Sequence, residues 1–173
     1  AAGFTAMLRR LSVDPAGKKA LVLGSGGASL TVRHVLATLG AREVVVISRS
    51  GENNYQNLDR HADAEILVNA TPVGMFPNCG VSPVDLKTLP RLSAVLDIIY
   101  NPARTQLLTD ASALGIPCIG GLTMLVEQAR AAAERFLGTP VSEALARKAY
   151  AAVLRDTQNI VLIGMPGCGK SAV

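Results

Sequence analysis

Two glycine-rich segments carry the residues that could take part in chemistry, and each follows an apolar stretch typical of a β-strand. The first, Gly24-Ser25-Gly26-Gly27-Ala28-Ser29, comes directly after Lys19–Leu23 and leads into a helical pattern over 30–39. Small residues at such a turn let the backbone approach a diphosphate, and the helix N-terminus supplies unpaired amides and a partial positive charge. The spacing therefore predicts a dinucleotide-binding turn formed by Gly24, Ser25, Gly26, Gly27 and Ala28.

This fingerprint departs from its strict form at the third small position, which is Ser29 rather than glycine. Serine still permits close packing of the helix on the strand. A glycine loop alone also fits an ordinary tight turn between a strand and a helix, so this alternative stays open.

The end of the next predicted strand, Glu43–Ile47, bears on the choice of nucleotide. A site for NAD usually places an acidic side chain there to bind the ribose, whereas a 2′-phosphate needs a cation and hydroxyl donors. Here the strand is followed by Ser48-Arg49-Ser50, with no acidic residue. Because Arg49 can make a paired, charge-assisted contact with a phosphate and both serines can donate to it, the sequence favours NADP. A solvated surface arginine is the alternative.

The second glycine-rich segment, Gly164-Met165-Pro166-Gly167-Cys168-Gly169-Lys170-Ser171, fits the pattern G-x-x-x-x-G-K-[ST] without a mismatch and follows the apolar stretch 159–163. In such a P-loop the backbone from Gly164 to Gly169 would cradle the phosphates of ATP, Lys170 would reach the β- and γ-phosphates, and Ser171 would bind Mg²⁺. Only two residues follow Ser171. We therefore expect 158–173 to be an inactive beginning of a second nucleotide-binding domain.

The composition predicts the fold class that must position these residues. Of the 173 residues, 49% are hydrophobic and only 3% aromatic, a balance that suits a globular core of buried parallel strands under close-packed helices. We predict an α/β fold, a Rossmann-like doubly wound parallel sheet with flanking helices, and a truncated P-loop strand at the C-terminal end.

Hydrophobic periodicity predicts the order of the elements, in which strands and helices largely alternate. Strands are predicted at Lys19–Leu23, Glu43–Ile47, Ile66–Asn69, 94–99 and 117–119, and helices at 5–11, 30–39, 105–114, Leu122–Leu137 and 142–155. The polar stretch 50–64 is interrupted by glycine and asparagine. It is predicted to be a long loop with room for a short helical turn.

Several classes of protein are disfavoured by charge and cysteine content. The net charge is +4 with scattered basic residues, which does not resemble a nucleic-acid surface. The three cysteines are far apart, so neither a disulfide framework nor a metal site is predicted. No membrane span or targeting segment is visible, and a reducing cytoplasm is the expected location. Since the chain does not begin with Met, we expect a fragment of a longer protein.

Four segments resemble the shikimate dehydrogenase family, in the family's order. They are the glycine turn at 24–29, Asn69-Ala70-Thr71-Pro72-Val73-Gly74-Met75, Asp97-Ile98-Ile99-Tyr100-Asn101-Pro102 and Gly120-Gly121-Leu122-Thr123-Met124-Leu125-Val126-Glu127-Gln128-Ala129. The resemblance implies that 1–157 is the NADP-binding domain of an enzyme that reduces 3-dehydroshikimate to shikimate with NADPH, in aromatic amino-acid (chorismate) biosynthesis.

The resemblance also implies roles for further residues. These are cofactor contacts at Asn69, Thr71, Gly121 and Met124, and substrate contacts at Tyr100 and Gln128. Each has a simpler alternative, since Met124 also fits core packing and Asn69 fits a strand-end cap. The implied ligands are NADP and a small-molecule substrate, and the resemblance leaves room for a homodimer.

The residues that transfer the proton in this family, a lysine and an aspartate, lie in an N-terminal substrate domain that precedes the matching segments. The resemblance therefore implies no catalytic residue in this chain. We expect Asp97 to be a strand-end residue rather than a substitute base. The isolated chain is expected to bind NADP and to be inactive.

The segment Ile163-Gly164-Met165-Pro166-Gly167 resembles the start of shikimate kinase. The resemblance implies a bifunctional dehydrogenase and kinase, in which 158–173 begins the kinase domain. Three alternatives stay open: a quinate/shikimate dehydrogenase, a P-loop phosphotransferase, and a nucleotide-binding module without catalysis.

Overall fold

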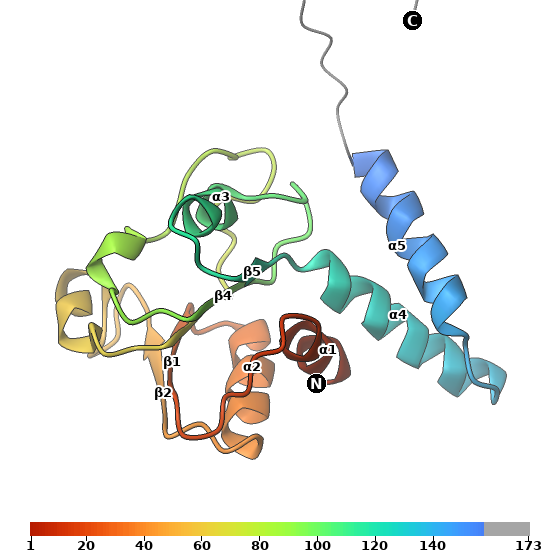
Figure 1. Ribbon diagram of the computed structural model, residues 1–173, viewed down its shortest axis with the longest axis horizontal. Helices are drawn as coiled ribbons and strands as arrows, with labels where there is room; N and C mark the ends of the chain where they lie inside the picture. The colour runs from red at the N-terminus through yellow and green to blue at the C-terminus, as the bar shows by residue number, and fades with distance from the viewer. Residues whose placement is uncertain (158–173) are drawn as a thin grey trace, which may run out of the picture.

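Short aliphatic runs form one parallel sheet in the computed structural model of the chain, which describes residues 1–157 (Figure 1). The sheet has five strands in the order β2-β1-β3-β4-β5, and every neighbouring pair is parallel. The strands are β1 (Lys19–Leu23), β2 (Glu43–Ile47), β3 (Ile66–Asn69), β4 (Ala94–Asp97) and β5 (Cys118–Ile119). The predicted α/β fold with a doubly wound parallel sheet is therefore confirmed.

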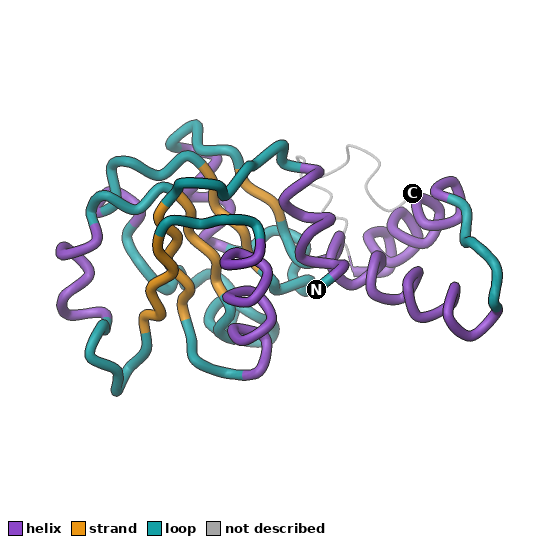
Figure 2. Tube along the Cα trace, turned by 90° about the horizontal axis from the view of Figure 1, so that it is seen from below, coloured by secondary structure: helices purple, strands orange, loops and turns teal. Residues whose placement is uncertain are grey.

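Helices cover both faces of this sheet (Figures 1 and 2). They are α1 (Ala2–Arg10), α2 (Gly27–Thr38), α3 (Gln106–Ala113), α4 (Leu122–Leu137) and α5 (Glu143–Thr157), with short 3₁₀ helices η1 (Tyr55–His61) and η2 (Leu86–Thr88). Because side chains alternate along a strand, Ala20 and Val22 of β1 pack against α1 and α2, whereas Leu21 and Leu23 pack against α3, η1 and η2.

The helices α4 and α5 form a hairpin that extends to one side of the sheet (Figure 2). Its own small core consists of Leu122, Val126 and Ala146. The helix α1 packs closely along α4, since a side chain at Gly3 would collide with the backbone of Met124. None of the helices in 1–157 is long and apolar enough to cross a bilayer.

Boundaries differ from the predicted ones where side chains or caps intervene. The predicted strand 94–99 ends at Asp97, because the Asp97 carboxylate accepts a hydrogen bond from the Ile99 amide at 3.1 Å. The helix α2 begins at Gly27 rather than Leu30, since Gly26 serves as its N-cap. The predicted loop 50–64 contains η1, which begins with a capping box at Asn54. The predicted P-loop strand and Gly164, Gly169, Lys170 and Ser171 lie outside the described residues.

The close approach of α4 to the sheet leads to a test by substitution at Gly121. A methyl group there would overlap the backbone of Ile98 at the end of β4, although the Gly121 φ of −70° suits any residue. We expect Gly121→Ala to lower the free energy of unfolding by about 1–3 kcal/mol, measured by denaturant titration, because the overpacked contact forces the backbone apart.

The matched control is Gly27→Ala, since a methyl group at Gly27 would meet no atom within 4 Å. Its expected change lies within about 0.5 kcal/mol. Equal effects of the two substitutions would contradict the steric role of Gly121.

Candidate functional site

A cavity of about 360 Å³ opens at the carboxyl ends of β1, β2 and β3. We call it the strand-end cavity. It is lined by Gly24, Ser25, Gly26, Ser48, Arg49, Tyr55, Ala70, Thr71, Pro72 and Val73. In an open parallel sheet ligands bind beyond the carboxyl ends of the strands, where the strand order reverses. Here the reversal lies between β1 and β3, so the cavity is at the expected place for a ligand.

The glycine turn forms one side of the strand-end cavity. Gly24 has a φ of 99° and its amide donates to the carbonyl of Ile47 at 2.8 Å, which ties the turn to β2. No side chain caps the N-terminus of α2, and a methyl group on Gly26 or Gly27 would meet no atom within 4 Å. The N-terminus of α2 therefore has no side-chain cap and has space beside its glycines, and such a terminus suits the binding of an anion.

The segment after β2 supplies the charge of the cavity. Arg49 is exposed, and it forms no salt bridge within the part of the chain that the structure describes. The cavity lining contains no acidic residue. The Ser48 amide donates to the carbonyl of Asn53 at 3.1 Å and so closes the turn that carries Arg49. An unpaired guanidinium beside a cavity without carboxylates fits a ligand with a phosphate group.

Tyr55, the first residue of η1, is a cavity residue that sequence reasoning missed. Burial raises the pKa of its hydroxyl, while the positive charge of Arg49 acts in the opposite direction. The hydroxyl thus stays protonated at neutral pH and can donate a hydrogen bond. The lone aromatic residue in the polar stretch 50–64 was the available signal. Ala70, Pro72 and Val73 also line the cavity; the sequence segment 69–75 contains them, but roles were predicted only for Asn69 and Thr71.

The opposite wall is the turn 70–74, which is held from behind by Asn69. This side chain is fully buried and is not part of the cavity lining. Its amide oxygen accepts hydrogen bonds from the Thr71 amide at 3.0 Å and from the Thr71 hydroxyl at 2.7 Å. The Thr71 hydroxyl in turn accepts from the Val73 amide at 3.2 Å. This position fits the predicted strand-end cap, whereas the predicted contact of Asn69 with a cofactor stays a prediction.

Asp97 at the end of β4 completes this buried network. Its carboxylate accepts hydrogen bonds from the Asn69 amide nitrogen at 3.1 Å and from the Thr105 hydroxyl at 2.7 Å, besides that from Ile99. Burial raises the pKa of Asp97 to about 6, and the three hydrogen bonds oppose this shift. Asp97 is thus a strand-end residue, as expected, and it does not line the strand-end cavity.

The structure brings together part of the predicted site. Gly24, Ser25, Gly26, Ser48, Arg49 and Thr71 share the strand-end cavity, whereas Gly27, Ala28 and Ser50 are chain neighbours of its lining. Tyr100 is exposed beyond β4, and Gly121 is buried where α4 begins. Met124 packs partly against the core beside α1, which supports its alternative as a core residue.

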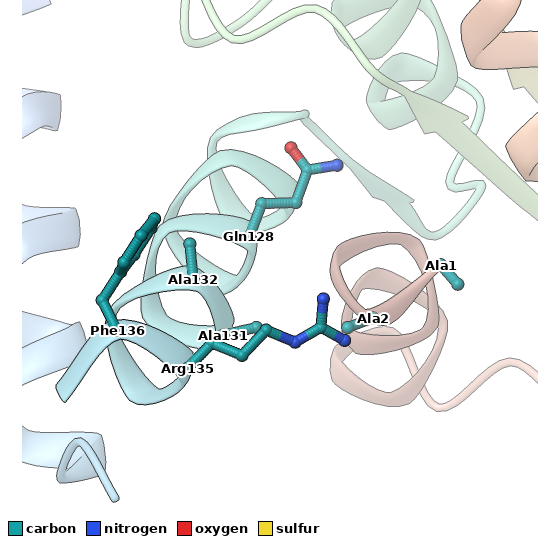
Figure 3. A pocket seen from close by; sticks show the side chains of 7 residues that line it. All are labelled: Ala1, Ala2, Gln128, Ala131, Ala132, Arg135 and Phe136. Carbon is teal, nitrogen blue, oxygen red and sulfur yellow. The ribbon is translucent and has the colours of Figure 1, made fainter. Parts of the chain in front are cut away.

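Gln128 lies at a second hollow, of about 620 Å³, between the start of α1 and one side of α4 (Figure 3). Arg135 and Phe136 also line this hollow. The predicted substrate and cofactor residues therefore do not form one cavity in this chain. Within 1–157, no group of three or more His, Cys, Asp or Glu side chains is placed to hold a metal ion.

Comparison with known proteins shows one recurrent similarity. No protein-family model matches the chain. A shikimate dehydrogenase (NADP(+)) from Crocosphaera subtropica is 37% identical over 164 residues, which cover 81% of this chain and 57% of that protein. A chorismate mutase/shikimate 5-dehydrogenase fusion protein from Clostridium acetobutylicum has a similar structure, with a TM-score of 0.84 and 32% identity over 90% of this chain and 60% of that chain.

A third match is a solved structure with bound ligands. Shikimate 5-dehydrogenase from Thermus thermophilus, in complex with NADP(H) and shikimate, has a TM-score of 0.74 and 29% identity over 88% of this chain and 61% of that chain. The chain thus spans about 60% of the length of the proteins that it matches. Its sheet with flanking helices is the fold of these structures.

The buried carboxylate of the site leads to a prediction on pH. The Asp97 carboxyl has a pKa raised from 3.8 to about 6, so the folded chain holds this proton more tightly than the unfolded chain. The resulting stability is present below about pH 4 and is lost as the pH rises through about 6. The difference in the free energy of unfolding between the wild type and Asp97→Asn should therefore fall by about 2–3 kcal/mol as the pH rises from about 4 to neutral.

Asp63→Asn is the control, because the contribution of Asp63 to stability should change with pH in the opposite direction. The hydrogen bond from Lys19, 2.8 Å long, lowers the pKa of Asp63, so its contribution is present at neutral pH and is lost as the pH falls below the usual carboxyl range. Denaturant unfolding across the pH range measures both. A flat difference for Asp97→Asn beside the expected trend for Asp63→Asn would show that the Asp97 pKa is not raised.

Proposed function

Because this chain is homologous to the shikimate dehydrogenases over 81% of its length, we propose that residues 1–157 are the NADP-binding domain of such an enzyme. The observation that carries the proposal is the strand-end cavity, in which a helix N-terminus without a side-chain cap and Arg49, which forms no salt bridge within 1–157, face a space without carboxylates. In the longer protein, this domain would serve the reduction of 3-dehydroshikimate to shikimate with NADPH. The matching Thermus thermophilus enzyme with bound NADP(H) and shikimate supports this assignment.

The residues present fit the cofactor, and each has a physical reason for its proposed role. The backbone amides of Gly26 and Gly27 hold the diphosphate, because no Cβ fills the space above them. Arg49 binds the 2′-phosphate, with Ser48 and Ser50 as hydroxyl donors. Thr71 and the turn that follows it form the opposite wall of the cavity. When bound, NADPH supplies the hydride for the reduction.

The substrate side is proposed from the resemblance. Tyr100, beyond the end of β4, and Gln128, on α4, are the proposed contacts with the substrate, and Gly121 and Met124 are proposed to border the nicotinamide. The groups that transfer the proton are proposed to lie in the part of the relatives that this chain does not match. On this proposal the chain alone binds the cofactor without turnover. A quinate/shikimate dehydrogenase is the close alternative.

A second proposed function concerns 158–173. The unbroken P-loop pattern from Gly164 to Ser171 supports the beginning of a shikimate kinase domain, in a protein that joins the dehydrogenase to the kinase. The matching fusion protein from Clostridium acetobutylicum joins a shikimate 5-dehydrogenase to a different enzyme, chorismate mutase.

The role of Arg49 gives a test of cofactor preference. We expect Arg49→Ala to raise the Kd for NADPH by about 10- to 100-fold, since a charge-assisted contact with the 2′-phosphate is lost, and to leave the Kd for NADH nearly unchanged. Isothermal titration of the full chain measures both values. Arg33→Ala, an exposed arginine on α2 away from the cavity lining, is the control and should change neither.

Three outcomes would count against this function. If Arg49→Ala weakens NADH and NADPH equally, Arg49 does not bind the 2′-phosphate. If the wild type binds neither dinucleotide, a nucleotide-binding module of another kind is favoured. If it binds ATP alone, a P-loop phosphotransferase is favoured.

The proposed kinase is tested in the longer protein. Lys170→Ala should reduce ATP-dependent phosphorylation of shikimate by at least about 100-fold, because the lysine contacts the transferred phosphate, and should leave NADPH-dependent reduction unchanged. Coupled assays of the two reactions on the same preparation give the comparison. Unchanged phosphorylation would exclude a catalytic P-loop at 164–171.

A further inference from the structure

Asp97 is a buried acidic residue that the proposed function leaves without a role. It lies at the end of β4, directly beside Asn69 at the end of β3, in the parallel register of the two strands. Asn69 in turn is followed by Thr71, which lines the strand-end cavity. A line of hydrogen bonds therefore leads from a carboxylate in the protein interior to the wall of the proposed cofactor site.

We propose that Asp97 is a positioning residue for the cofactor: through Asn69 it fixes Thr71 and the turn 70–74 that forms one wall of the strand-end cavity. This inference rests on the proposed function, because the ligand whose binding depends on that wall is NADPH.

The donors and acceptors of Asp97, Asn69 and Thr71 fix the orientation of the Asn69 side chain. A carboxylate only accepts hydrogen bonds, so Asp97 requires the NH₂ group of Asn69 to face it. The amide oxygen of Asn69 is then turned toward Thr71, where it accepts from both the backbone amide and the hydroxyl. If the Asn69 side chain were flipped, its NH₂ group would meet the Thr71 amide, and two donors would face each other.

The orientation of Thr71 also decides which of its groups faces the glycine turn. Its hydroxyl donates to Asn69 and accepts from Val73, which leaves the methyl group toward Gly24. A Cβ built on Gly24 would lie 2.9 Å from this methyl group, so the two turns are in close contact. The two sides of the cavity thus meet at this threonine.

The Asp97 carboxylate has a second contact, with Thr105, so the loss of Asp97 should affect both the start of α3 and the wall of the cavity. The Thr105 hydroxyl donates to the second carboxylate oxygen of Asp97 and, as the N-cap residue of α3, accepts from the Leu108 amide. The Thr105 contact stabilises the start of α3. The Asn69 contact leads to the cavity. Substitutions on the two sides of the carboxylate therefore distinguish a positioning role from a structural one.

The test compares Asp97→Ala with Thr105→Val in the full chain. Asp97→Ala removes the nearer acceptor for the Asn69 amide nitrogen and leaves its longer bond to the Val73 carbonyl, at 3.4 Å. It should raise the Kd for NADPH by about 5- to 10-fold, as expected for the loss of one ordered hydrogen bond. Thr105→Val should lower the melting temperature and leave the Kd unchanged. Asp97→Asn keeps an oxygen that can accept from Asn69, so we expect it to restore most of the affinity.

A double-mutant cycle shows whether Asp97 acts through Thr71. In a Thr71→Val background, which lacks the hydroxyl but keeps the backbone amide that donates to Asn69, Asp97→Ala should cause a smaller further loss of NADPH affinity than in the wild type, because one of the two hydrogen bonds from Thr71 to Asn69 is already absent. If the two losses multiply, Asp97 acts by another route and the inference fails.

A second readout needs no cofactor. Hydrogen exchange of the Thr71 and Val73 amides should become at least about 10-fold faster in Asp97→Ala and stay at the wild-type rate in Thr105→Val. If Asp97→Ala does not fold, Asp97→Val removes the same acceptors and keeps the buried volume filled. A folded Asp97 variant with unchanged exchange at both amides overturns the inference. A wild type that does not bind NADPH overturns the proposed function instead, since exchange is measured without it.

Discussion

The parallel register of β1, β3 and β4 is the constraint on which the site depends. Leu23 pairs with Asn69, and Asn69 pairs with Asp97, so the last residues of three strands lie in one row. The glycine turn follows the first of these strands and the turn 70–74 follows the second. A shift of one residue in the pairing of β3 with β4 would place the side chains of Asn69 and Asp97 on opposite faces of the sheet and separate them. The aliphatic residues of these strands, buried on both faces, prevent such a shift.

The sequence was sufficient to predict the elements of the fold and much of the cavity. Strands such as β1 and β3 are continuous apolar runs bounded by turn residues, and this pattern depends on local sequence alone. Gly24, Gly26 and Arg49 were predicted as site residues because a strand, a turn and a helix in direct succession fix their relative positions. The α/β class followed from the same alternation.

The rest depends on contacts between segments distant in sequence, which no local pattern contains. Asn69 and Asp97 were each assigned a possible strand-end role, yet their hydrogen bond spans 28 positions and exists only because β3 and β4 are neighbours. Tyr55 lines the cavity as the first residue of η1, a helix that begins with a capping box at Asn54 in a stretch whose composition predicts only a loop. Gln128 lies in a separate hollow, because α4 leaves the sheet with its hairpin.

The exposed position of Arg49 has a consequence for the proposed discrimination between nucleotides. A charge in contact with water is screened by mobile ions over about 8 Å at physiological ionic strength, whereas amide dipoles at a helix end act at contact distance. The proposed contribution of the guanidinium to binding a doubly charged phosphate thus varies with the surrounding electrolyte, while that proposed for the glycine turn varies less. Selectivity between related nucleotides is then a property of the protein together with its medium.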